Sequence, residues 1–324
     1  MAINKVVLGD QTLIDLTSDT VTPDTLAVGA TAHDKTGARI TGVMEAGGDE
    51  RFGADYDIWV GTLDANGKLC FPPSDVKVDL VFAGVKDLES RILAHKFYMK
   101  FRGNINSVSF PDLEQITGSY ALEYFCSWNT GIKNILFPKL KHIPGAYAFS
   151  RAFYLSGGFT EVSFPSLLTV TGDFAFANAF ENISGLTALH FPALKQIGSD
   201  THTSYTNNGG HFSNIISSDN SCRTLSFPEL TAIYCTGGSG GYNGTFAANN
   251  TLQRIDFPKL TVIDKSPAYT GSINVTSHKQ IFYQCSALTE IHFGVANQAA
   301  VEATEGYATL WGRGAGNATV YFDL

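Results

Sequence analysis

The chain has 324 residues, with 22 Lys and Arg against 30 Asp and Glu, which gives a formal net charge of −8 at pH 7. Such an acidic balance lacks the basic face that displaces phosphate counterions, and this argues against nucleic acid as a partner. Charged residues make up only 16% and hydrophobic residues 44%, so the chain can bury a core and is not disordered.

Neither the opening residues nor the cysteines point to export. The segment MAINKVVLGDQTLIDL contains one Lys and no long apolar run, so we expect no secretory signal. Five cysteines stand far apart without CxxC or metal-ligand spacing, which predicts buried thiols rather than disulfides. We therefore expect a chain that is made and folded in a reducing cytoplasm and has no membrane span.

Residues 1–48 are predicted to form a small N-terminal module that ends in a linker. Thr22-Pro23-Asp24 is a helix-start signal with Gly29 as the stop, and residues 34–37 are predicted as a turn between two short strands. The words TLIDLTSDTVTPDTL and TAHDKTGARITG resemble a module of tail-associated and hypothetical proteins from phages and prophages of Gram-positive gut bacteria. That resemblance implies attachment or assembly, and it places a possible homo-oligomer contact in residues 1–48.

Residues 49–75 are predicted to cap the domain that follows. Tyr56 to Val60 alternates as a strand does, and Asp64-Ala65-Asn66-Gly67 is a strong hairpin turn.

A repeat occupies residues 76–293. Phe-Pro recurs with spacings of 27, 27, 27, 36 and 30, at Phe110, Phe137, Phe164, Phe191, Phe227 and Phe257, and degenerate copies stand at Phe82 and Phe293. The flanking apolar residues also repeat, which defines the unit L-x-x-I-x-F-P-x-L-x-x-I. The I-x-F step has the period of a β-strand, proline ends that strand, and L-x-x-I suits a turning segment.

One unit cannot fold alone. It holds only about five or six inward apolar groups worth roughly 1.5–3 kcal/mol each. Ordering ~27 residues costs about 1–2 kcal/mol apiece in backbone entropy. Stacked units share a continuous core, so the repeat predicts a solenoid.

The stretch IFYQCSALTEIHF, residues 281–293, resembles the core of BspA-type leucine-rich repeats. This resemblance covers residues 76–324 and implies an α/β to mainly β fold, a right-handed solenoid with one parallel β-sheet. The Phe-Pro signature, the long period and three swollen loops depart from the family pattern. Residues 294–324 break the repeat and are predicted as a C-terminal cap, with a short helix at 297–305 and a strand at 318–322.

The three swollen loops, residues 199–221, 235–250 and 264–280, are rich in Gly, Ser, Asn, Thr and Tyr. Insertions of a solenoid fall on one edge, often the binding edge, and this composition is that of adaptable binding loops. The alternative is that they are solvated loops without function. The candidate binding residues here are Tyr205, Asn207, Asn208, His211, Tyr242, Asn243 and Tyr269.

The outward positions of the predicted strands form the second candidate surface, either a recognition face or a solvated one. Its chemistry-bearing members are His190, Arg254, Asp256 and His292, and we expect both histidines to point away from the core. The recurring aromatic residues Tyr120, Tyr124, Phe149, Phe153, Tyr154, Phe174 and Phe176 are interpreted as core rather than sugar-stacking platforms.

Nothing in the sequence predicts catalysis, a cofactor or a metal site. The glycine run GGSGG at residues 237–241 has no following Lys, no helix and no acidic partner, and there is no H-E-x-x-H. The prediction is a non-enzymatic binding protein, phage or prophage tail-associated, whose partner is a protein or glycan of a bacterial surface. It would then lie in the virion. The alternative is a bacterial cell-surface or secreted adhesin.

Overall fold

The computed structural model describes residues 5–8, 11–15, 31–33, 35–36, 38–41, 58–59, 62–63, 69–70, 78–93, 105–201, 209–218, 220–234, 244–264, 281–304 and 318–324. The chain divides into two compact units, Met1–Pro72 and Pro73–Leu324.

The first unit contains short antiparallel pairs. Strand β1 (Lys5–Leu8) pairs with β2 (Gln11–Asp15), and β3 (Thr31–His33) pairs with β4 (Arg39–Thr41) across the predicted turn. Strand β6 (Thr62–Leu63) pairs with β7 (Leu69–Cys70), as the predicted hairpin requires, and β5 spans Ile58–Trp59. The predicted helix at residues 22–29 lies outside the described residues.

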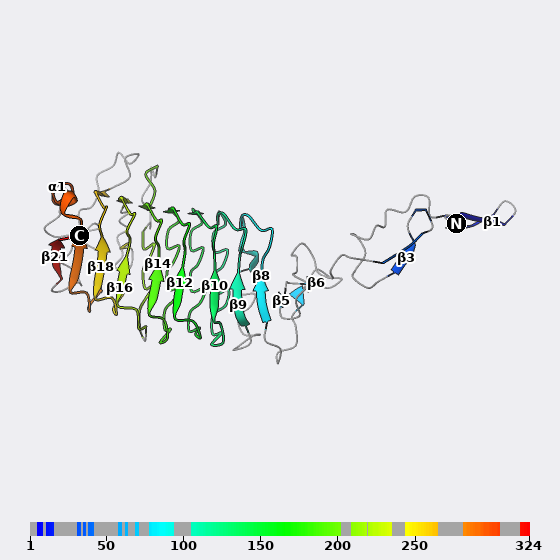
Figure 1. The fold of residues 1–324 in the computed structure, drawn as a ribbon, viewed down its shortest axis with the longest axis horizontal. Helices are drawn as coiled ribbons and strands as arrows, with labels where there is room; N and C mark the ends of the chain where they lie inside the picture. Colours follow the sequence, from blue (N-terminus) through cyan, green and yellow to red (C-terminus); the bar gives the residue numbers. More distant parts are fainter. Residues whose placement is uncertain are drawn as a thin grey trace. The chain divides into compact units, whose positions relative to one another are not determined.

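The second unit is a β-solenoid, which confirms the predicted fold class (Figure 1). Its larger sheet is parallel and runs in the order β21-β20-β18-β16-β14-β12-β10-β9-β8. The strands are β8 (Val78–Val81), β9 (Ile105–Ser109), β10 (Asn134–Leu136), β12 (Glu161–Ser163), β14 (Ala188–His190), β16 (Thr224–Ser226), β18 (Arg254–Phe257), β20 (Glu290–Phe293) and β21 (Thr319–Phe322). Equivalent repeat positions pair, for example Val162 with Leu189 and Ile255 with Ile291.

A second parallel sheet lies where the sequence predicted only a turning segment. It has five strands, β11 (His142–Ile143), β13 (Thr169–Val170), β15 (Gln196–Ile197), β17 (Ala232–Tyr234) and β19 (Val262–Asp264). These are the L-x-x-I segments. Because each turn repeats the same short extended step, neighbouring copies form ladder hydrogen bonds despite their length.

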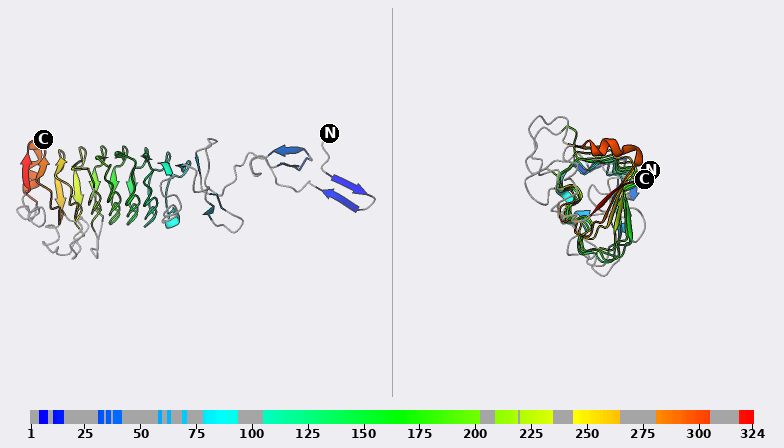
Figure 2. Two further views of the ribbon diagram at one scale, coloured as in Figure 1. Left: turned by 90° about the horizontal axis from the view of Figure 1, so that it is seen from below. Right: turned by 90° about the vertical axis from the view of Figure 1, so that its left-hand side faces the viewer.

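The third side of each coil consists of consecutive tight turns, here called the turn layer: residues 119–129, 146–156, 173–183, 210–218, 244–250 and 281–286. Every second N–H donates to the next coil, for example Tyr120 N to Ala146 O and Leu122 N to Ala148 O, both 2.8 Å. Every fourth residue has a left-handed φ, such as Tyr120 (60°), Tyr124 (52°) and Trp128 (66°). The end-on view shows the coils of the second unit superimposed (Figure 2).

A stack of phenylalanine rings forms the core. The Phe-Pro rings are buried and lie parallel from coil to coil, with centroids 5.5 Å apart between Phe137 and Phe164 and 5.4 Å between Phe164 and Phe191. A second stack from the turn layer includes Phe149 and Phe176, 4.9 Å apart, and meets the first edge-on. Offset and edge-to-face ring contacts stabilise such a core beyond simple area burial.

The C-terminal cap has the predicted elements. A 3-10 turn, η4 (Val295–Asn297), leads into the short helix α1 (Gln298–Glu302), whose Val301 is fully buried. Strand β21 then pairs parallel with β20 and places Phe322 on Phe293, with ring centroids 5.5 Å apart.

Candidate functional site

The outward face of the larger sheet is lined mainly by small and polar side chains, because strand positions alternate between core and solvent. Asn134, Glu161 and His190 are exposed, and Leu136 is 51% exposed although it is a large hydrophobic residue. His190 therefore points outward, as predicted. The face is supported from below by the phenylalanine stack, so its residues stand on a rigid element.

Two shallow hollows meet at His190. One, of about 470 Å³, is lined by Asn134, Leu136, Glu161 and Ser163, and His190 closes it. The other, of about 340 Å³, lies between His190 and the Thr224–Ser226 strand. A proline follows the Phe at the end of each of these strands, as in Pro138 and Pro192, and these prolines line the hollows. The hollows combine hydroxyls, an amide, a carboxylate, an imidazole and the Lys133 ammonium with apolar groups, among which the Leu136 side chain is exposed.

Strands β18 and β20 carry a cluster of charged side chains on the same outward face. Arg254 Nε lies 2.8 Å from Asp256 Oδ1, and Arg254 Nη1 lies 3.6 Å from Glu290 Oε2. The carboxylates raise the pKa of the Arg254 guanidinium, with the hydrogen bond to Asp256 as the largest cause. Arg254 and Asp256 are half-buried, so their charges largely satisfy one another.

His292 lies on the outer face of the sheet, as predicted, but it is only 5% exposed and not in open solvent. Its Nδ1 lies 2.7 Å from Asp323 Oδ1 and its Nε2 lies 3.2 Å from Glu290 Oε2. The ring of Tyr321 stacks on the His292 imidazole, with ring centroids 4.6 Å apart. Strand β21 extends the sheet beyond the last repeat and covers His292. The repeat pattern alone did not predict this cover.

His211 is misplaced by the sequence prediction. It was expected in an exposed loop, but the chain enters the turn layer by Gly209, and His211 is 1% exposed. Its carbonyl accepts a 2.8 Å hydrogen bond from Phe176 N of the preceding coil. The predicted binding residues Tyr205, Asn207, Asn208, Tyr242, Asn243 and Tyr269 lie outside the described residues.

The sequence prediction did not identify the outer surface of the turn layer as a candidate site. Tyr120, Tyr147 and Phe174 are half-exposed and stack in a row, with centroids 4.7 and 5.0 Å apart. Tyr124 and Tyr154 also lie partly exposed. The core interpretation therefore holds for Phe149, Phe153 and Phe176 but is wrong for the other four predicted residues, Tyr120, Tyr124, Tyr154 and Phe174. The four-residue spacing of 120, 124 and 128 was the available signal.

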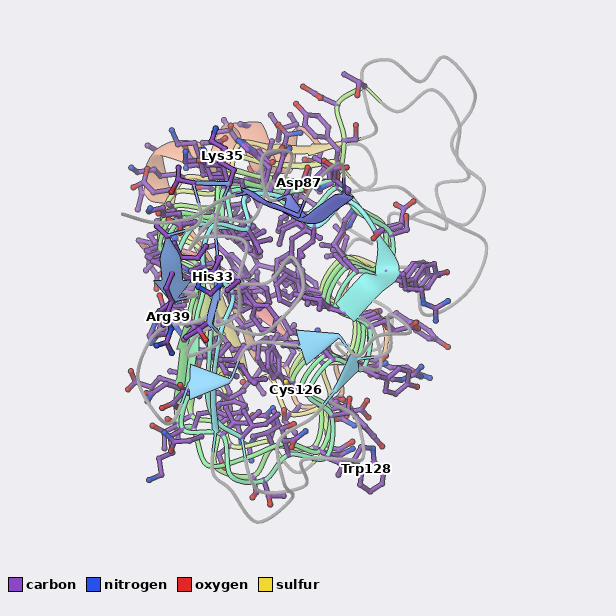
Figure 3. All side chains as sticks on the ribbon, turned by 90° about the vertical axis from the view of Figure 1, so that its right-hand side faces the viewer. His33, Lys35, Arg39, Asp87, Cys126 and Trp128 are labelled. Carbon is purple, nitrogen blue, oxygen red and sulfur yellow. The ribbon has the colours of Figure 1, made fainter. Side chains whose placement is uncertain are left out.

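Cations accompany these rings. The Arg91 guanidinium carbon lies 5.1 Å from the Tyr120 ring centroid, and that of Arg151 lies 5.4 Å from the Tyr124 centroid. Burial, with Tyr120 and Asp173 as further causes, raises the pKa of Tyr147. Trp128 is 37% exposed and projects from the outer rim of the coil, whereas Cys126 lies inside it (Figure 3).

The described residues offer little for covalent or metal chemistry. Burial raises the pKa of the Cys126 thiol well above its usual range and that of Cys285 to about 12, so both stay protonated at neutral pH. Across the described ranges, no group of three or more His, Cys, Asp or Glu side chains is placed to hold a metal ion. Nor does any helix in that part of the chain have the length and apolarity to cross a membrane.

No protein-family model and no curated protein matches the chain. Among solved structures, the chain is similar to a leucine-rich cell surface protein of Faecalibacterium prausnitzii A2-165. The two are 14% identical, the match covers 84% of this chain and 94% of that chain, and the TM-score is 0.19.

Proposed function

We propose that the chain is a non-enzymatic recognition protein that binds a protein or glycan of a bacterial surface through its larger sheet. The observation that carries the proposal is the pair of hollows that meet at His190 on a rigid, outward-facing sheet. A ligand that binds there orders few flexible side chains, because most lining residues are small or held by the strand.

The composition of the hollows favours a neutral or weakly charged partner. Glu161 and His190 are exposed among hydroxyl and amide groups, and Leu136 supplies an exposed apolar side chain to the lining of the hollow. Sites of this kind combine one apolar anchor with a few polar groups that fix orientation.

Two settings remain for this binding activity. The resemblance of residues 1–48 to modules of phage and prophage tail proteins supports a tail-associated protein, assembled through that segment. The resemblance of the repeats to BspA-type proteins supports the alternative, a bacterial cell-surface or secreted adhesin. Recovery of the chain from purified virions would favour the first, and recovery from the cell-wall fraction would favour the second.

The sheet hypothesis is tested with the full chain, labelled fluorescently, on intact cells and isolated cell walls of Gram-positive gut bacteria. Leu136→Asp and His190→Ala should each weaken binding about tenfold, since a central contact is worth more than 1 kcal/mol. Val295→Asp is the matched control, because Val295 is 61% exposed in the cap and lines neither hollow. Equal binding by all three variants and the unaltered chain would exclude the sheet and favour the loops at residues 199–221, 235–250 and 264–280.

A further inference from the structure

A polar hollow of about 640 Å³ opens on the turn layer of the later coils, away from the sheet strands. Glu181, Asn214, Ser218, Asn250, Gln284 and Ser286 surround it, and Ala248 also lines it. These residues come from four successive coils, so the hollow exists only because the solenoid stacks them.

The hollow has a simple structural cause. Tyr124, Arg151, Asn178, Asn214, Ala248 and Gln284 occupy equivalent left-handed positions along the turn layer, with φ between 51° and 60°. Backbone hydrogen bonds join these positions, for example Asn214 N to Ala247 O and Ala248 N to Tyr283 O. Ala248 has the smallest side chain of the column, which leaves a gap between Asn214 and Gln284. Alanine is a poor choice for a left-handed φ, where Asn or Gly is favoured.

The groups around this gap are mostly neutral and partly unused. Glu181 is held by Asn178 Nδ2 at 2.6 Å, with Ser218 Oγ at 3.5 Å, and Asn250 Oδ1 accepts from Ser218 N at 2.9 Å. Within the described part of the chain, the side chains of Asn214, Gln284 and Ser286 form no hydrogen bond. Amides and hydroxyls both donate and accept, and they face the same space.

We propose that this hollow, which we name the Ala248 pocket, is a binding site for a neutral saccharide. The hydroxyl groups of a sugar donate and accept, so they match amides and hydroxyls of the pocket. A sulfated or phosphorylated ligand fits poorly, because the described lining contains no Lys or Arg and its charged group is the Glu181 carboxylate. The site is separate from the sheet hollows and does not depend on the function proposed above.

The test is a titration of the full chain with neutral oligosaccharides built from glucose, galactose and N-acetylglucosamine, followed by calorimetry and saturation-transfer NMR. We expect at least one to bind with a dissociation constant below about 1 mM, about −4 kcal/mol. Ala248→Gln should lower that affinity at least tenfold by filling the gap. The substitution suits the backbone, since Gln284 has the same left-handed φ in the same column.

Gln284→Ala provides a second variant that keeps the fold, because alanine already occupies this column at residue 248, and it should also weaken binding. Trp128→Ala is the matched control on the same layer, several coils away, and should leave affinity unchanged. The Leu136→Asp sheet variant should likewise leave it unchanged, which separates this site from the sheet hypothesis. Absence of binding by every neutral sugar, preference for sulfated sugars, or affinity unaffected by both pocket variants would overturn the proposal.

Discussion

The early coils and the later coils of the solenoid share one core but differ in the number of residues per coil. In residues 105–201 the Phe-Pro spacing is 27, whereas in residues 209–293 it rises to 30 and 36. The ring stack does not register this change, since Phe164–Phe191 and Phe191–Phe227 are 5.4 and 5.5 Å apart. Extra residues are therefore added outside the core and leave its packing intact.

A column of glycines forms the corner that follows the second sheet in the early coils. Gly118, Gly145 and Gly172 follow the second sheet by two positions, and a Cβ on Gly145 would lie 2.3 Å from Gly118 O. This close approach allows a tight corner, and Phe176 follows Val170 by only six positions. In the next coil the glycine stands one position earlier, as Gly198 with φ +78°, and Phe212 follows Ile197 by 15 positions.

The shared core is tested first, by the change with the largest expected effect. Phe164→Ala and Phe227→Ala should each lower the free energy of unfolding by about 3–5 kcal/mol, because each removes a fully buried ring. Urea denaturation followed by circular dichroism measures this. A loss at Phe227 less than half that at Phe164 would show that the later coils are looser, against the continuous ring stack.

The close approach at the glycine corner of the early coils is tested second. Gly145→Ala should cost about 2–3 kcal/mol, since the added methyl meets the backbone of the preceding coil. Gly84→Ala is the matched control: Gly84 has φ +76° but open space around it, so only about 1 kcal/mol of backbone strain is expected. Thermal unfolding of both variants decides the question, and equal losses would contradict the close-approach explanation.

Buried side chains that bridge coils provide the third comparison. In the later coils Asn249 Nδ2 donates to Phe212 O and Phe246 O, and Asn249 Oδ1 accepts from Ile216 N at 3.0 Å. In the early coils Ser156 Oγ donates to Cys126 O at 2.8 Å. Asn249→Ala should therefore cost about 2–3 kcal/mol and Ser156→Ala about 1 kcal/mol. Equal losses in urea denaturation would refute the stronger bridging of the later coils.

Exposed ion pairs between coils should contribute least to stability, and they should contribute equally in the early and the later coils. Lys139 Nζ lies 2.7 Å from Asp112 Oδ1, and Lys259 Nζ lies 2.6 Å from Glu229 Oε1. The hydrogen bond from Lys139 lowers the pKa of Asp112, so its contribution is present above the unfolded pKa of Asp, about 4, and is lost as the pH falls through the lower folded value. Asp112→Asn should lower Tm slightly at pH 7 in low salt and not at about pH 2. Glu229→Gln is the counterpart, and a shift that persists at high salt would argue against a screened surface pair.

The candidate site was only partly predictable. Strand alternation placed Glu161 and His190 on the outer face, because that inference needs only the period of the repeat. The same rule placed His292 on the outer face but did not predict its burial, which depends on Tyr321 and Asp323, outside the repeat. The Ala248 pocket could not be predicted, because its residues come from coils whose alignment is set by backbone hydrogen bonds.

The sequence by itself determined the solenoid, its phenylalanine core and the strand of each coil, because Phe-Pro and its apolar neighbours recur at every coil. Tertiary structure decided the second sheet, the left-handed turn layer and the surfaces where coils meet. A two-residue strand or a half-exposed tyrosine has no distinct local signal. Each is stabilised by the equivalent residues of adjacent coils, and that stacking exists only in the folded chain.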